Sequence, residues 1–264
     1  MNIHTALESA KSRCYEQIAS TLALVGIGNL PNTFLVGAIR SGTTSLASYL
    51  ADHPNATYGL KKEPGYFTRY DRRPITFYKA NFPRFVDTIV DATPDYLFQS
   101  ECLQRITEIV DAPRILVMLR DPVARALSHF EHARKHGWAD NRSWQTCMDP
   151  QIAGQNILRM KRGEQPDSRH LMYLEQSCYD FQIARVKSLF SQVHLMRIED
   201  WLSTPQTERI RLADFLGLDP EGLSPHLPHL NRGNRQVRPL LPRLPDDVIS
   251  LIRKENTLYY SDTL

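Results

Sequence analysis

Apolar residues follow two different periods along this chain. Short apolar runs predict buried strands at 34–36, 115–119 and 193–198. Three- and four-residue spacing of apolar positions predicts helices at 3–25, from near Gly42 to before Pro54, and at 97–110, 122–137, 171–190, 205–216 and 245–256. Strands that alternate with helices indicate an α/β fold with a P-loop-like parallel sheet, flanked by helices on both faces.

Three segments follow neither period. Residues 68–90 are aromatic, basic and irregular, and residues 138–168 hold two tryptophans and two prolines, which predicts an irregular insertion over the core. The segment 229–245 carries several arginines and no acid before Leu244. We expect one domain spanning 1–264, with residues 1–30 as an N-terminal helical extension.

Composition narrows the class of protein. With 264 residues, 42% hydrophobic and 23% charged, the chain is long and apolar enough to bury a large core. A net charge of +3 is too small for a general nucleic-acid binder, but it suits an anionic small molecule in a basic cleft. The four cysteines form no CxxC pair, so structural zinc and a disulfide framework are not expected.

No stretch has the length and apolarity of a membrane span, and the N-terminus lacks the apolar centre of a signal peptide. We therefore expect a cytoplasmic protein with no membrane and no nucleic-acid partner. The oligomeric state is not predicted.

The first strand leads into a turn suited to an anion. Gly37 and Gly42 bracket the turn, Arg40 adds a positive charge, and a helix begins where the turn ends. Free amides and the positive end of the helix dipole favour a phosphate there. Four hydroxyl side chains accompany them: Ser41, Thr43, Thr44 and Ser45.

The second strand ends in the same way, 80 residues later. Arg120 follows the apolar run, Asp121 is a plausible N-cap, and Pro122 suits the first position of a helix. The sequence therefore predicts two cations, each placed between a strand end and a helix N-terminus.

The glycine spacing of the first turn matches a Walker A loop, but the residue after Gly42 is Thr43. A P-loop NTPase needs a lysine at that position for the β- and γ-phosphates. A Mg-NTP-dependent kinase is therefore an alternative that fits the residues less well. A non-catalytic nucleotide-binding protein is the second alternative.

The two cationic motifs together resemble those of sulfotransferases that use 3′-phosphoadenosine 5′-phosphosulfate (PAPS). In that family a strand, a basic residue and Ser/Thr-Gly-Thr-Thr bind the 5′-phosphosulfate, which corresponds here to Arg40 through Ser45. An arginine at a strand end and a serine eight residues on bind the 3′-phosphate, and Arg120 and Ser128 have that spacing.

Three further segments are similar to the branch of heparan sulfate N- and O-sulfotransferases and their bacterial relatives. Lys62-Glu63-Pro64 with Tyr66-Phe67 resembles the segment whose glutamate is the proposed catalytic base, and Thr93-Pro94-Asp95-Tyr96 resembles a segment near the acceptor. Arg232, Gly233, Asn234 and Arg235 resemble a basic loop that covers the nucleotide.

The resemblance implies roles for these residues. PAPS would be the donor, 3′-phosphoadenosine 5′-phosphate (PAP) the product, and no metal would be needed. Arg40 stands where this branch commonly has lysine, and since arginine does not give up its proton, its role would be electrostatic. Glu63 would be the base. Lys62, Tyr66, Phe67, Asp95 and Tyr96 would contact the acceptor, a hydroxyl or amine of a small metabolite or carbohydrate.

Several polar residues admit simpler interpretations. A salt bridge to a neighbouring lysine is the alternative role for Glu63, and Asp91 and Asp95 are lesser candidates for the base. Arg125 is expected to be a surface charge. Three histidines share the helical spacing of metal ligands, but a polar face near the nucleotide is the favoured interpretation: His129, His132 and His136.

Overall fold

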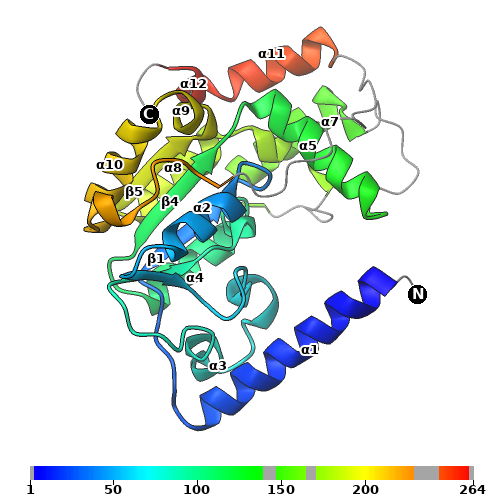
Figure 1. Ribbon diagram of the computed structural model, residues 1–264. Coiled ribbons are helices and arrows are strands. Elements are labelled where there is room, and N and C mark those ends of the chain that lie inside the picture. The colour runs from blue at the N-terminus through cyan, green and yellow to red at the C-terminus, as the bar shows by residue number, and fades with distance from the viewer. Residues whose placement is uncertain (1–2, 139–146, 165–170, 229–243, 262–264) are drawn as a thin grey trace.

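The computed structural model describes residues 3–138, 147–164, 171–228 and 244–261. A five-stranded parallel sheet lies at its centre, in the order β2-β3-β1-β4-β5 (Figure 1). Its strands are β1 (Thr33–Gly37), β2 (Ala56–Tyr58), β3 (Thr88–Asp91), β4 (Arg114–Leu119) and β5 (Gln192–Arg197). The prediction of a parallel α/β sheet is confirmed.

The side chains of the central strand β1 alternate between two apolar layers, as the two-residue period of a strand requires. Phe34 and Val36 belong to one layer and Leu35 to the other, all fully buried. The first layer is covered by α4 (Ser100–Ile109) and α8 (Asp180–Leu189). The second is covered by α2 (Thr43–Ala51), α9 (Ile198–Ser203) and α10 (Pro205–Leu216). Helices therefore cover both faces of the sheet.

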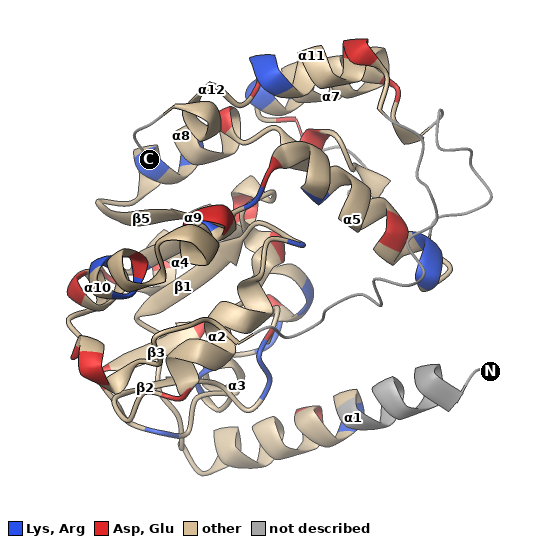
Figure 2. Cartoon of the chain, turned by 45° about the horizontal axis from the view of Figure 1, so that its top comes forward, with Lys and Arg blue, Asp and Glu red and all other residues tan. Residues whose placement is uncertain are grey.

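The N-terminal helix α1 (Ile3–Leu24) lies at one edge of the molecule beside α3 (Ile75–Lys79), as Figures 1 and 2 both show. Its last turns contact the first apolar layer. Tyr15 meets Phe77 edge-on at 6.2 Å between ring centroids, and Ala19 is fully buried. The predicted helix at 3–25 is thus confirmed.

A third apolar cluster joins α5 (Pro122–Lys135), α7 (Pro150–Lys161) and α11 (Asp246–Lys254), which gather on one side of the sheet in Figure 1. Phe130 of α5, Ala153 of α7 and Val248 of α11 are buried in it. The short helix α12 (Thr257–Tyr260) follows α11. None of the helices that the structure describes is long and apolar enough to cross a lipid bilayer.

Several short elements were not predicted from the sequence. The irregular segment 68–90 contains the π-helical turn Tyr66–Tyr70 in part, then α3 and most of β3, and β2 and α9 were also missed. Strands of three and four residues are too short to show a period. The edge strand β2 and its neighbour β3 are therefore visible only through their pairing.

The predicted irregular insertion at 138–168 is wrong in its second half, where α7 runs from Pro150 to Lys161. Pro150 suggested a break, but it occupies the first turn, where proline is tolerated. Asp149 caps that turn, because its carboxylate accepts from the amides of Gln151 at 2.8 Å and Ile152 at 3.1 Å.

The predicted long helix at 171–190 is also wrong in its first half, since α8 begins at Asp180. The preceding residues form the 3-10 turn Glu175–Ser177. The buried guanidinium of Arg125 donates hydrogen bonds to the Tyr173 carbonyl and to Ser177 Oγ in this segment. These residues therefore pack against α5 instead of extending α8.

The sheet topology places the ends of several strands in one region. The chain leaves β1 for the β2 and β3 side and returns to pair β4 with the other edge of β1. Ligands in such sheets bind outside the carboxyl ends of the strands, where the connections diverge. This reversal lies at the end of β1, directly before Arg40.

Candidate active site

The turn after β1 is the first part of the candidate site. The Ala38 amide donates to the Met118 carbonyl of β4 at 2.7 Å, which ties the start of the turn to the sheet. Arg40 and Gly42 have left-handed backbone conformations, with φ of 67° and 92°. Helix α2 begins at Thr43, and its backbone bonding opens with the Leu46 amide on the Gly42 carbonyl at 3.1 Å. Its first amides thus precede the helical ladder and face the turn.

The hydroxyls of this turn differ in exposure. Ser41 is fully buried, and Thr43 and Ser45 are nearly so. Thr44 is half-buried and accepts a hydrogen bond from the Lys62 ammonium at 3.0 Å. Thr44 is therefore the hydroxyl of α2 that meets another functional segment.

Arg120 is the second cation, at the end of β4. Its guanidinium donates to the Arg40 carbonyl at 3.3 Å, so the two strand ends are in direct contact. Asp121 caps α5, since its carboxylate accepts from the Ala124 amide at 2.8 Å. The predicted N-cap is confirmed.

The two motifs meet through Arg40. Its Nε donates to Ser128 Oγ of α5 at 3.3 Å, across 88 residues of sequence. The pKa of Arg40 is lowered, first by burial and then by the positive charge of Arg120. Two guanidinium groups and the start of α2 thus share one partly buried region, an arrangement that favours a bound anion.

Lys62 and Glu63 follow β2 and reach the same region. The Lys62 ammonium pairs with Glu63 Oε1 while it donates to Thr44. The side chain of Lys62 is 18% exposed and that of Glu63 46% exposed. Lys62 therefore links the carboxylate of Glu63 to the first turn of α2, and Glu63 keeps access to solvent.

Comparison with known proteins shows which family the chain belongs to. Residues 30–241 match the family described as "Sulfotransferase domain", which covers most of the chain. This chain belongs to the sulfotransferase family.

Two curated relatives show how far the likeness extends. The membrane-associated sulfotransferase kil1 of Dictyostelium discoideum is 32% identical over 129 residues, which cover 47% of this chain and 27% of the relative. Human heparan sulfate glucosamine 3-O-sulfotransferase 6 is 25% identical over 197 residues, which cover 73% of this chain and 54% of the relative. The chain thus matches about half or less of the length of these relatives.

The fold is shared with solved bacterial sulfotransferases. A sulfotransferase from Alicyclobacillus acidocaldarius superposes with a TM-score of 0.66 at 22% identity, over 86% of this chain and 93% of that one. The sulfotransferase domain of the curacin biosynthetic pathway gives a TM-score of 0.51 at 16% identity, over 88% of this chain and 99% of that one.

In this sulfotransferase domain, three aromatic residues expected to contact an acceptor are core residues instead. Tyr66, Phe67 and Tyr96 are 5%, 1% and 0% exposed. Phe67 meets the ring of Tyr96 edge-on at 5.5 Å, and Tyr66 donates its hydroxyl to the Arg73 carbonyl at 2.7 Å. Their burial leaves no surface for an acceptor, so the prediction is wrong for these side chains.

The remaining predicted contacts have mixed outcomes. Asp95 is only partly exposed, and its Oδ2 lies 3.9 Å from the guanidinium of Arg69. The loop residues Arg232, Gly233, Asn234 and Arg235 lie outside the described residues, so their role over the nucleotide stays a prediction.

Arg125 is not a surface charge. It is fully buried, and burial lowers its pKa to about 10. Its guanidinium donates to Ser177 Oγ at 2.6 Å and lies 3.4 Å from Nδ1 of His129. Hydroxyl, carbonyl and imidazole groups therefore compensate its charge.

The three histidines of α5 do not converge on one point. His129 packs edge-on against Tyr173, whereas the rings of His132 and His136 lie 4.1 Å apart between centroids, tilted by 48°. Burial, followed by the charge of Arg40, lowers the pKa of His132 to about 4. Among the described residues no group of three acidic, histidine or cysteine side chains could hold a metal ion. The interpretation as a polar face near the nucleotide stays a prediction.

Sequence reasoning missed two residues that contact the end of β4 beside the candidate site. Tyr179 donates its hydroxyl to the Arg120 carbonyl at 2.9 Å, and Glu199 accepts from the Asp121 amide at 2.9 Å. Both hold the end of β4. No local pattern marks them, because the contacts span 59 and 78 residues.

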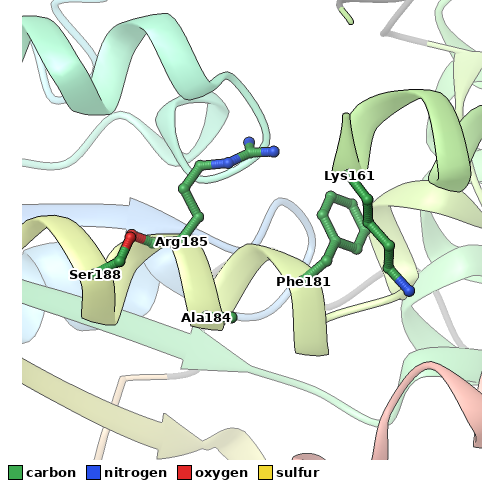
Figure 3. A pocket seen from close by; sticks show the side chains of 5 residues that line it. All are labelled: Lys161, Phe181, Ala184, Arg185 and Ser188. Atoms are coloured by element: carbon green, nitrogen blue, oxygen red, sulfur yellow. The ribbon is translucent and has the colours of Figure 1, made fainter. Parts of the chain in front are cut away.

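A cavity of about 500 Å³ lies elsewhere, beside α7 and α8. Figure 3 shows its lining side chains, with Phe181 and Arg185 on the same helix and Lys161 opposite. None of the predicted site residues that the structure describes lines it. The location of the candidate site therefore rests on the strand ends and their charges, not on cavity size.

Proposed function

We propose that this sulfotransferase domain transfers the sulfuryl group of PAPS to a hydroxyl or amine of a small metabolite or carbohydrate. The supporting observation is the contact between two anion-binding motifs, in which Arg40 reaches Ser128 and Arg120 reaches the Arg40 backbone. A nucleotide with separate 5′ and 3′ phosphates matches two such motifs. A triphosphate with Mg²⁺ matches them less well, because no lysine follows Gly42.

The residues present suit an anionic donor. Burial lowers the pKa of Arg40, and repulsion from the positive charge of Arg120 lowers it further. Negative charge between them would relieve this repulsion. Arg40 and the first turn of α2 would hold the 5′ end, and Arg120 with Ser128 would hold the 3′-phosphate.

In the proposed reaction, Glu63 removes the acceptor proton. The acceptor oxygen or nitrogen then forms its bond to sulfur as the bond from sulfur to the bridging oxygen breaks. The electron pair leaves with that oxygen as part of PAP. Arg40, Lys62 and the α2 amides stabilise the charge that develops there, since such positioned donors act in a partly dry site. The proton stays on Glu63 until it is released to solvent.

Carbohydrate acceptors are suggested by one of the relatives, whose name states that it acts on heparan sulfate. Glu63 is about half exposed, which leaves room for an acceptor approaching from solvent. We infer no particular sugar or metabolite.

Donor binding is tested by thermal unfolding with PAP and, separately, with ATP and Mg²⁺. PAP at a hundredfold excess over its Kd should add about 2.7 kcal/mol to the free energy of unfolding. Arg120→Ala should weaken PAP binding roughly tenfold to a hundredfold, since a charged hydrogen bond contributes about 1.5–3 kcal/mol. Arg159→Ala is the matched control, because Arg159 forms a surface ion pair with Glu164. Stabilisation by ATP with Mg²⁺ alone would point to a kinase.

The base is tested with Glu63→Gln. Loss of a general base should lower kcat about 10²- to 10⁴-fold, with PAP affinity kept within about twofold. The control is Glu164→Gln, another carboxylate about half exposed and paired with a cation. Unchanged turnover in Glu63→Gln would remove this residue as the base. PAP binding without transfer to any acceptor would favour a non-catalytic nucleotide-binding protein.

A further inference from the structure

We propose that Asp91 is a positioning residue, whose buried carboxylate gathers three hydroxyls that fix the segment carrying Lys62 and Glu63 beside α2. The inference rests on the proposed function, because it gives that segment its role. It also accounts for the burial of the aromatic residues that follow Glu63.

Asp91 is the last residue of β3 and is fully buried. Its Oδ2 accepts from the hydroxyls of Tyr78 at 2.7 Å and Tyr96 at 3.1 Å, and its Oδ1 accepts from Thr93 at 2.6 Å. Each carboxylate oxygen has two lone pairs, so one side chain can hold all three donors. Burial raises the pKa of Asp91 to about 6 against the opposing effect of these hydrogen bonds, which leaves it mainly ionised at neutral pH.

The first connection from Asp91 runs through Thr93 to the backbone near Glu63. Thr93 Oγ1 donates to Asp91 and accepts from the Gly65 amide at 3.2 Å. Gly65 has φ of 64°, a left-handed conformation in which a side chain would be strained. Pro64 lies between Gly65 and Glu63 and restricts the backbone further. The position of Glu63 is therefore set two residues away, at a single buried amide.

The second connection runs through the aromatic rings. Tyr78, held by Asp91, stacks on Tyr66 with 4.5 Å between ring centroids and 17° between planes. Phe67 meets both Tyr78 and Tyr96 edge-on, at 5.3 and 5.5 Å. Both tyrosine partners of Asp91 thus pack against the two residues after Gly65. Such ring pairs contribute energy and a defined geometry.

The two connections give the same result. Polar contacts fix the Gly65 amide, and ring packing fixes the residues after it. The segment that carries Lys62 and Glu63 is therefore anchored directly after Glu63. The hydrogen bond from Lys62 to Thr44 then closes the link to α2. Catalytic geometry depends on such support, since a displacement of about 1 Å can lower a rate about a hundredfold.

Thr93→Val tests this arrangement, because it keeps the shape of the side chain and removes both of its hydrogen bonds. We expect kcat for transfer from PAPS to a heparan sulfate oligosaccharide to fall at least tenfold, with the Kd of PAP kept within about twofold. Thr93→Ser should restore kcat to within about threefold of the wild type. Thr33→Val is the control, since Thr33 is equally buried but starts β1, at the opposite end of the sheet.

Amide hydrogen exchange at Gly65 gives a readout that needs no activity. Thr93→Val should speed this exchange at least tenfold and leave exchange in α8 unchanged. Wild-type exchange at Gly65 in Thr93→Val, or wild-type kcat despite a lower Tm, would overturn the proposal. If the wild type transfers sulfate to no acceptor, the proposed function fails, and the exchange rate at Gly65 still decides the positioning of the segment.

Discussion

Replacing Asp91 with asparagine should change how the stability of this protein depends on pH. Burial raises the pKa of Asp91 from its usual value of 3.8 to about 6 in the folded state. The folded chain therefore binds this proton more tightly than the unfolded chain. The contribution of this proton to the free energy of unfolding is fully present below the unfolded pKa of 3.8 and is lost as the pH rises through about 6.

The magnitude follows from the two pKa values. A difference of about two pKa units, at about 1.36 kcal/mol each, gives about 3 kcal/mol. Asp91 is fully buried, so solvent screening does not reduce this figure. Asparagine has nearly the same shape and does not titrate. Relative to Asp91→Asn, the wild type should gain about 2.4 kcal/mol between pH 7.5 and pH 4, because the unfolded carboxyl is still partly ionised at pH 4.

Urea unfolding of both proteins at several pH values between 7.5 and 4 measures this difference. Other carboxylates titrate over the same range, but they do so in both proteins and cancel in the comparison. A difference that stays constant within about 0.5 kcal/mol across the range would show that the folded-state pKa of Asp91 is not raised. A relative loss of wild-type stability on acidification would show that the sign is wrong.

Three further variants test other parts of the structure. Arg125→Ala removes the donor to the Tyr173 carbonyl and leaves a cavity. The free energy of unfolding measured in urea should therefore fall by about 3 kcal/mol. A loss below about 1 kcal/mol would contradict a structural role for Arg125. Asp149→Ala removes the cap of α7 and should cost about 1 kcal/mol in the same assay, with kcat unchanged. In thiol titration with a disulfide reagent, exposed Cys14 should react in the native protein, whereas Cys178, whose pKa is raised by burial, should react only on unfolding. If folded Cys14→Ser protein still reacted as fast as the wild type, Cys14 would not be the thiol that reacts in the native state.

The centre of the candidate site could be proposed from the sequence because its signals are local. A buried strand, a glycine turn and a helix start occur within a few residues around Arg40, and the step of eight residues from Arg120 to Ser128 runs from the end of β4 into the second turn of α5. These patterns need no knowledge of pairing. The structure adds the direct contact between Arg40 and Ser128, which sequence spacing does not contain.

Burial of polar and aromatic residues could not be predicted in the same way. Arg125 lies on an amphipathic helix and looks like a surface residue until the segment at 173–177 packs over it. From the sequence, Tyr66 and Phe67 resemble residues that line a pocket. In the structure, β3 places Asp91 and its hydroxyl partners at the end of the sheet, and the two rings pack there. Because β3 is only four residues long, its sequence carries no period. Tertiary pairing, not local pattern, decides these roles.

The hydrogen bond from Arg40 to Ser128 has a consequence for the order in which substrates add. In this structure the serine expected to hold the 3′-phosphate already has a partner, at 3.3 Å. A nucleotide that takes over Ser128 would release the Arg40 guanidinium and free it to turn toward the 5′ end. Arrival of the donor would then prepare the site for the acceptor. Steady-state kinetics should therefore show donor-first addition, with PAP competing against PAPS.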